Sequence, residues 1–202
     1  MALIVQKYGG TSLADAERVR HVAARVGRAF DVRNQIVVVV SAMGNTTDWL
    51  IELAHQVSTN PDQRELDVLL STGEIVSCTL LTMALRTLGY EAISLSGQQA
   101  GIWTDASYGQ ARIARLNPKR IHQELARGRI VIVAGFQGVT EEMDVTTLGR
   151  GGSDTTAVAL AAGLGADHPM LQLCCWQRQN YLIWISIWSQ SPPILDRISH
   201  FY

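Results

Sequence analysis

The sequence has few cysteines, few charged residues and no long apolar run, and each shortage excludes a class of protein. Its three cysteines, Cys78, Cys174 and Cys175, are too few and too poorly spaced for a disulfide framework or a zinc site. Charged residues make up 17% and the net charge is −1, which provides no basic surface for nucleic acid or an anionic membrane. Nowhere do about 18 apolar residues occur together. We therefore expect a cytoplasmic protein with reduced thiols, with neither a nucleic acid nor a membrane as partner.

Several catalytic patterns are also missing. The five histidines include no i, i+4 pair suited to metal binding, and no Ser/His or Cys/His arrangement indicates nucleophilic catalysis. No run of residues matches the Walker spacing or the dinucleotide fingerprint. We predict no metal site built from side chains, and any nucleotide has to be bound by a different kind of loop.

Strand patterns alternate with helical patterns along the chain. Residues 36–40 are β-branched with no polar alternation, which is typical of a parallel strand covered on both faces. Further strand patterns occupy residues 3–6, 91–96 and 129–134. A chain of 202 residues is long enough for one large domain. The alternation predicts an α/β protein, a three-layer α/β/α sandwich with a mostly parallel central sheet.

Helix boundaries follow from capping residues, glycine and proline. The first helix is expected to begin at Ser12 and Asp15, and the helix after residue 150 is expected to be capped by Ser153 or Asp154. A helix that starts near Asp62 is expected to pause at residues 71–73 and to resume at Glu74. Another helix is expected between the first helix and the one that starts near Asp62. Its apolar stripe consists of Trp49, Leu50, Leu53, Ala54 and Val57.

Polar, glycine-containing loops follow the strands, and in a parallel sheet such loops meet at one edge, where ligands bind. Lys7 ends a strand beside a glycine pair, so its ammonium could reach a phosphate; the alternative is a solvated charge. The hydroxyls of Ser41, Thr46 and Thr47 could line the same ligand-binding edge; the alternative is that each one caps its local backbone. Glu74 is either a first-turn acid or a carboxylate that meets an ammonium group.

The glycine-rich stretch 149–152 leads into an alanine-rich helix. A helix N-terminus offers unpaired N–H groups and the positive end of the helix dipole, which suit phosphate or carboxylate. The alternative is an ordinary capped helix after a flexible turn. This stretch, residues 147–154, is the last of four motifs, and the others span residues 7–12, 39–48 and 70–74.

Together and in this order, the four motifs resemble the signature set of the aspartate kinases, within the amino-acid kinase family, over residues 1–167. The resemblance implies transfer of the γ-phosphoryl group of ATP, with Mg²⁺, to the β-carboxylate of L-aspartate. That reaction opens the biosynthesis of lysine through diaminopimelate, and of threonine and methionine.

The resemblance also implies roles for individual residues. Lys7 and Asp154 would be catalytic, with Lys7 on the transferred phosphoryl group and Asp154 orienting that lysine. Arg150 would bind the α-carboxylate of aspartate, and Glu74 its α-ammonium group. The residues implied for the ATP phosphates are Lys7, Tyr8, Gly9, Gly10 and Ser41. The residues implied for aspartate are Thr46, Thr47, Glu74, Arg150, Gly151, Gly152, Ser153 and Asp154.

The resemblance stops after residue 167. The family pattern continues with another sheet strand, an acidic nucleotide-binding segment and a second active-site lysine, and we find no counterpart of these in residues 168–202. That segment holds three of the five tryptophans and two of the three cysteines, a sharp change of composition. We therefore divide the chain into a catalytic part, 1–167, with a fold incomplete at its C-terminal side, and a divergent tail, 168–202. A frameshift is our leading explanation and a lineage-specific ending the alternative.

Three functional hypotheses follow. The first is an aspartate kinase catalytic half, from which no activity is expected in isolation. The second is another member of the family with a different acceptor. The third is an inactive remnant or partner subunit, in a homo-oligomer or in association with a complete kinase subunit.

Overall fold

The computed structural model describes residues 2–166, 168–171 and 183–184. Its centre is a six-stranded sheet with the order β10-β9-β1-β2-β6-β3. All neighbouring strands in this sheet run parallel except β10, which is antiparallel to β9. The strands are β1 (Leu3–Tyr8), β2 (Gln35–Val40), β3 (Ala92–Leu95), β6 (Ile130–Ala134), β9 (His168–Leu171) and β10 (Ile183–Trp184).

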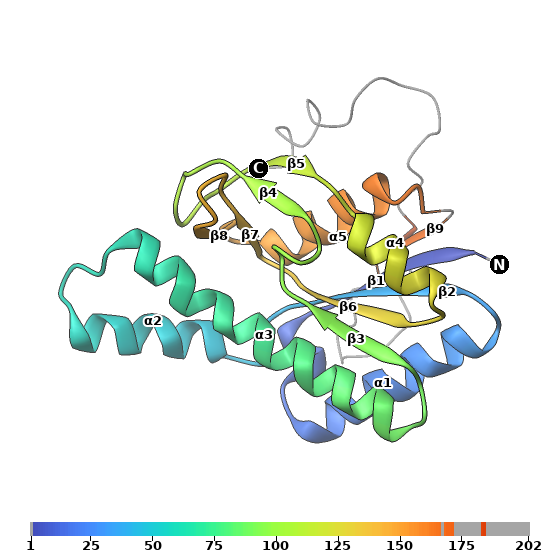
Figure 1. The fold of residues 1–202 in the computed structure, drawn as a ribbon. Coiled ribbons are helices and arrows are strands. Elements are labelled where there is room, and N and C mark those ends of the chain that lie inside the picture. The colour runs from blue at the N-terminus through green and yellow to red at the C-terminus, as the bar shows by residue number, and fades with distance from the viewer. Residues whose placement is uncertain (1, 167, 172–182, 185–202) are drawn as a thin grey trace.

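Helices cover both faces of this sheet, as the sequence predicts. The helices α1 (Ala16–Asp31) and α3 (Gln63–Thr87) lie on one face, and α4 (Lys119–Ala126) and α5 (Gly152–Gly163) on the other (Figure 1). Alternate residues of β2 point to opposite layers, so that Val38 packs with α1 and α3 while Val39 packs with α5. The uninterrupted β-branched run therefore has a partner on each side, and the three-layer α/β/α sandwich is confirmed.

A second sheet, absent from our expectations, stands beside the first. It has four strands in the order β5-β4-β7-β8, mostly antiparallel. Its strands are β4 (Ile102–Thr104), β5 (Ile113–Leu116), β7 (Gln137–Val139) and β8 (Val145–Thr147). Because three of its strands are only three residues long, they are too short to produce a recognisable period in the sequence.

The first and last described helices begin differently from the expectation. Asp15 caps α1 by accepting a hydrogen bond from the Arg18 N–H at 2.8 Å, whereas Ser12 is buried in a separate 3-10 turn, η1 (Gly10–Leu13). At α5 the N-cap is Gly151, which has φ +77° and no side-chain cap. Ser153 and Asp154 therefore lie in the first turn of α5, and neither side chain caps the helix.

The expected pause in α3 was wrong, because the helix continues through residues 71–73. The hydroxyls of Ser71 and Thr72 donate to the carbonyls of Val68 and Leu69. The polar groups of these weak helix formers therefore find their hydrogen-bond partners within the helix. A Cβ at Gly73 would lie 3.0 Å from the Ala42 side chain, so the loop after β2 sits directly against the helix. Glu74 is consequently a mid-helix residue and not a first-turn acid.

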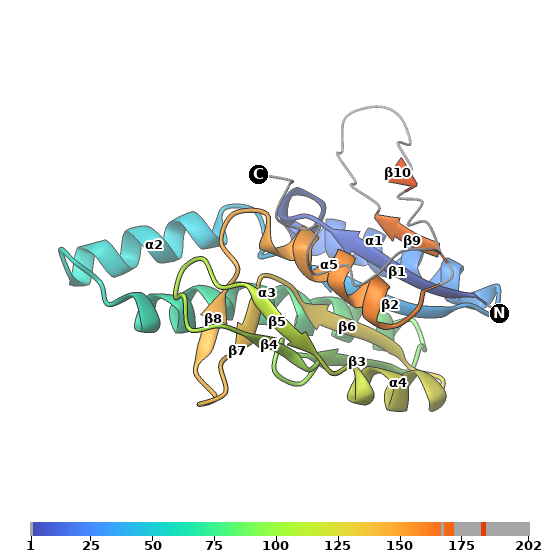
Figure 2. The same ribbon diagram turned by 90° about the horizontal axis from the view of Figure 1, so that it is seen from above.

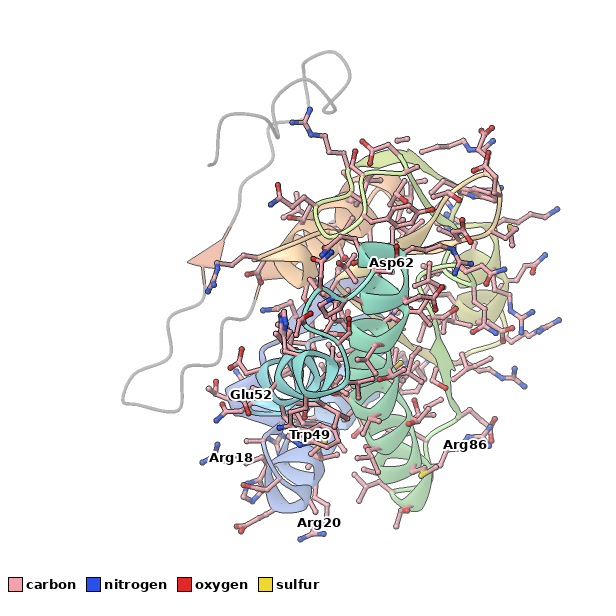
Figure 3. All side chains as sticks on the ribbon, turned by 90° about the vertical axis from the view of Figure 1, so that its left-hand side faces the viewer. Arg18, Arg20, Trp49, Glu52, Asp62 and Arg86 are labelled. Carbon is pink, nitrogen blue, oxygen red and sulfur yellow. The ribbon has the colours of Figure 1, made fainter. Side chains whose placement is uncertain are left out.

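The apolar stripe expected on α2 (Thr46–Val57) is mostly uncovered. Leu50 is buried, but Trp49 is 58% exposed and Val57 is 84% exposed. α2 packs alongside α3 and projects beyond the central sheet (Figure 1), and Figure 3, which looks along α2, shows Trp49 and Glu52 around this helix. The period correctly identified the residues that share a face, but α3 covers that face only in part, at Leu50.

α3 is long and apolar enough to cross a membrane by length and composition, with a mean hydropathy of 1.7 in its most apolar window. Half of that window is buried inside the protein. The apolar character of α3 therefore reflects its packing against the central sheet and against its neighbour α1.

We expected no further sheet strand after residue 167, and this expectation was wrong. β9 pairs in parallel with β1, with Ile4 opposite His168, and lies beside β1 in Figure 2. β9 and β10 fall within the segment that we assigned to a divergent tail. The rest of that segment, 172–182 and 185–202, lies outside the described residues, so the boundary at residue 167 and its frameshift explanation stay predictions.

Candidate active site

A cleft of about 530 Å³ opens beyond the carboxyl ends of β1 and β2. Its walls come from the β2–α2 loop, one face of α3, the β4–β5 loop and the loop that leads from β8 into α5. Elements far apart in the sequence meet here because parallel strands present their carboxyl ends at one edge of the sheet.

The cleft gathers most of the residues that the sequence singled out. Those that line it are Lys7, Gly10, Ser41, Thr47, Glu74, Arg150, Gly151, Gly152, Ser153 and Asp154. Tyr8, Gly9 and Thr46 are outside the lining. Tyr8 is fully buried, and its hydroxyl donates to the Gln6 side chain at 3.1 Å. The functional roles of all thirteen residues remain predictions.

Lys7 and Asp154 form an ion pair in this cleft. The Lys7 Nζ lies 2.7 Å from Asp154 Oδ1, with the lysine side chain 7% exposed and the aspartate 42% exposed. β1 continues to Tyr8, so Lys7 belongs to the strand itself and is fixed by the sheet. Gly9 lies close by, since a Cβ there would be 3.7 Å from Lys7 Nζ. Lys7 is therefore a buried side chain fixed by the sheet and by Asp154, and not a solvated surface charge.

The loops after β1 and β2 interlock at Gly10. The Gly44 N–H donates to the Gly10 carbonyl at 3.0 Å, and a Cβ on Gly10 would lie only 2.5 Å from the Ala42 carbonyl oxygen. Thr46 closes this turn by donating its hydroxyl to the Met43 carbonyl at 2.6 Å, which is the local-capping alternative. Thr47 lines the cleft and makes no side-chain hydrogen bond within the described residues.

Glu74 reaches the cleft from the middle of α3. Its Oε1 accepts a hydrogen bond from the Ala42 N–H at 3.0 Å, whereas its Oε2 is buried and has no hydrogen-bond partner among the described residues. Burial raises the pKa of the Glu74 carboxyl from 4.5 to about 7, although the Ala42 N–H opposes this shift. A buried carboxylate oxygen without a donor is costly, so this group is suited to a ligand that brings a positive charge or a proton.

Arg150 lies in the short loop of residues 148–151, between β8 and α5. The residues on either side of it, Gly149 and Gly151, have positive φ angles of +73° and +77°. Residues that carry a Cβ rarely adopt this backbone conformation. The loop is joined to α5 by a hydrogen bond from the Gly152 N–H to the Gly149 carbonyl at 3.0 Å. Arg150 is thereby placed at the cleft, beside the N-terminus of α5 and its positive dipole end.

Two features of the cleft were missed. Asp67, fully buried in the second turn of α3, lines the cleft about two helical turns from Glu74. Its signal was present, because an acid between Leu66 and Leu70 falls on the apolar face of the helix. Phe136, after β6, also lines the cleft and has φ +68°, for which the sequence offers no sign. In residues 2–166 no group of three His, Cys, Asp or Glu side chains is arranged to hold a metal.

Comparison with known proteins agrees with this geometry. Residues 2–171 match the amino acid kinase family. The chain is 59% identical over 167 residues to the aspartokinase of Geobacillus stearothermophilus, covering 83% of this chain and 41% of that protein. The chain therefore spans about two fifths of the length of the curated relatives it matches.

Solved structures show the same similarity. The aspartate kinase of Synechocystis superposes with a TM-score of 0.73 at 48% identity, over 84% of this chain and 28% of that one. Aspartokinase III of E. coli, crystallised with aspartate and ADP, superposes with a TM-score of 0.75 at 26% identity, over 85% of this chain and 49% of that one.

Proposed function

The chain belongs to the amino acid kinase family, and on that premise we propose that its cleft binds L-aspartate for phosphorylation by ATP. The acceptor would be the β-carboxylate, and the product 4-phospho-L-aspartate. The similarity to aspartokinases and the aspartate and ADP bound to the E. coli relative support this proposal. The observation that carries it is the buried, unpartnered Oε2 of Glu74, which calls for a cationic group of the kind that an α-amino acid provides.

In this proposal the cleft recognises both ends of the amino acid. Glu74 pairs with the α-ammonium group, which supplies the donor that Oε2 lacks. Arg150 binds the α-carboxylate, for which the planar guanidinium offers two parallel N–H donors. Thr47 and Ser153 also line the cleft and have hydroxyls that can hydrogen-bond the substrate.

Phosphoryl transfer to a carboxylate needs no general base, because the nucleophile is already ionised. The protein has to bring two anions together and neutralise the charge that develops between them. Lys7 serves this purpose at the end of β1, and Asp154, 2.7 Å away, holds its ammonium group in place.

The phosphate side of the cleft is suited to ATP. Gly10 lines the cleft, and because a Cβ there would collide with the Ala42 carbonyl, only glycine lets the loops after β1 and β2 pack this closely at the phosphate side. Ser41 also lines the cleft and completes the phosphate-facing wall. The α5 N-terminus, with Gly151 and Gly152, presents its N–H groups to the aspartate substrate. Mg²⁺ that accompanies ATP would neutralise phosphate charge.

Titration of the chain with L-aspartate and with succinate tests the proposal. We expect L-aspartate to bind, succinate to bind much more weakly because it lacks the ammonium group, and Arg150→Lys to weaken aspartate binding. Lysine supplies a point charge in place of the two-pronged contact. Equal affinity of the wild type for aspartate and succinate would refute the role of Glu74, and no binding of aspartate would refute the proposed substrate.

A further inference from the structure

Asp67 has no role in the proposed reaction, yet its carboxylate accepts several hydrogen bonds from distant segments of the chain. Its Oδ2 accepts from the Thr147 N–H at 2.9 Å and the Gly109 N–H at 2.9 Å, and its Oδ1 accepts from the Thr147 hydroxyl at 2.6 Å. The side chain is fully buried on α3, which is anchored against the central sheet. An ionised carboxylate is suited to this position because it can accept hydrogen bonds from all three donors at once.

These bonds fix the starting point of the loop that carries Arg150. Thr147 is the last residue of β8, and α5 begins at Gly152, so only residues 148–151 connect the two. The α5 end of the loop is held because Gly152 packs tightly against Leu148 and Phe136. At the β8 end Thr147 is held by Asp67, by the Ala111 N–H, which donates to its carbonyl at 2.8 Å, and by its pairing with Gln137 of β7. The next N–H, that of Leu148, donates to the Phe136 carbonyl at 2.8 Å.

The same carboxylate also holds the neighbouring β4–β5 loop against this segment. The Gly109 N–H bonds Asp67, and a Cβ on Gly149 would lie 3.2 Å from the Gly109 carbonyl oxygen. Gly149 is therefore packed against a loop that Asp67 positions. Because Gly149 and Gly151 have great conformational freedom, the loop relies on these external contacts for a single conformation.

We propose that Asp67 is a positioning residue that fixes the 148–151 loop through Thr147 and Gly109, and thereby sets the place of Arg150 in the cleft. The consequence for the amino-acid substrate rests on the proposed function. The consequence for the loop does not, because it follows from the contacts of the protein alone. Asp67 itself does not contact the substrate in this proposal.

The test compares amide hydrogen exchange and L-aspartate binding in four variants. Asp67→Asn keeps the shape but turns an NH₂ group toward backbone donors, so exchange at residues 149–154 should rise and aspartate affinity should fall about tenfold. Thr147→Val removes one donor and should act in the same direction, while Thr147→Ser keeps the hydroxyl and should behave like the wild type.

The matched control is Thr146→Val, which breaks the buried hydrogen bond between the Thr104 and Thr146 hydroxyls, 2.6 Å long, in the same sheet. This variant should lose stability without added exchange at residues 149–154. Equal exchange in Asp67→Asn and Thr146→Val would overturn the proposal, as would equal behaviour of Thr147→Val and Thr147→Ser if Asp67→Asn fails to fold. A wild type that does not bind aspartate refutes the proposed function alone, because the exchange comparison still decides the role of Asp67.

Discussion

Asp67 and Glu74 lie on the same face of α3, line the same cleft and are both buried, yet their partners differ. Asp67 accepts hydrogen bonds from two backbone N–H groups and a hydroxyl. Glu74 accepts one, from Ala42, and its second oxygen has no partner within the described residues. A buried carboxylate loses its hydrogen bonds to water, and only at Asp67 do several donors within the protein replace them.

The difference separates structure from ligand binding. A carboxylate whose acceptors are already occupied can hold loops together but has little left to offer a substrate. A carboxylate that is left incomplete destabilises the free protein, and a ligand that completes it regains that energy on binding. The comparison therefore predicts opposite results when the two acids are replaced by their amides.

The largest expected effect is on stability at pH 8. Because the pKa of Glu74 is raised from 4.5 to about 7, the folded protein binds a proton that the unfolded chain has released between these values, and stability falls as pH rises through this window. Glu74→Gln resembles the protonated form and should be more stable than the wild type above pH 7, by about 3 kcal/mol. Asp67→Asn should instead be less stable, by about 2 kcal/mol.

Urea unfolding at pH 4.5 and pH 8 measures both effects. At pH 4.5 the advantage of Glu74→Gln over the wild type should largely disappear, because the folded wild type is then protonated at this position. Destabilisation by both amides at pH 8 would show that Glu74 has a partner equivalent to those of Asp67.

A third acid in the cleft, Asp154, extends the comparison because its partner is a side-chain cation. Lys7→Ala removes that cation, and in a version of the enzyme with an intact nucleotide-binding half, kcat in an aspartyl-hydroxamate assay should fall by about a hundredfold or more, as for other lost charge contacts to a transition state. Lys119, exposed at the start of α4, is the matched control, and Lys119→Ala should leave kcat unchanged. An unchanged kcat in Lys7→Ala would reduce the Lys7–Asp154 pair to a structural contact.

Much of this arrangement could be predicted from the sequence. The β-branched run of β2 required cover on both faces, and the polar loops after the strands had to meet at one edge of the sheet. The loop inference places Lys7 at this edge, whereas Glu74 and Arg150 were assigned to the same site by the resemblance to the family.

What could not be predicted depends on contacts between distant residues. The small residues 71–73 suggested a break in α3, but packing of Gly73 against Ala42 keeps the helix continuous. The stripe on α2 had the period of a buried face, and a period does not reveal whether another element covers it. Asp67 could be recognised as an acid on the apolar face of a helix, but its donors could not, because they belong to Gly109 and Thr147, many residues away.

A smaller effect is expected in the pH dependence of binding. With a pKa of about 7, Glu74 is mostly protonated at pH 6 and mostly ionised at pH 8. Only the ionised form attracts the α-ammonium group, so L-aspartate should bind about tenfold more weakly at pH 6 than at pH 8. In Glu74→Gln the affinity should be low and should change little between these values. A wild type with no such dependence would mean that the ammonium group binds elsewhere in the cleft.

The smallest expected effect applies the same reasoning to two neighbouring hydroxyls. Thr46 donates to the Met43 carbonyl at 2.6 Å, whereas Thr47 lines the cleft without a side-chain hydrogen bond among the described residues. Thr47→Val should therefore weaken L-aspartate binding by about threefold to tenfold, the range for one neutral hydrogen bond, with little change in stability. Thr46→Val should lower the free energy of unfolding by about 1 kcal/mol and alter the affinity by less than about twofold. Calorimetric titration and urea unfolding of the two variants measure this contrast, and a larger loss of affinity in Thr46→Val would mean that its hydroxyl turns toward the substrate when aspartate binds.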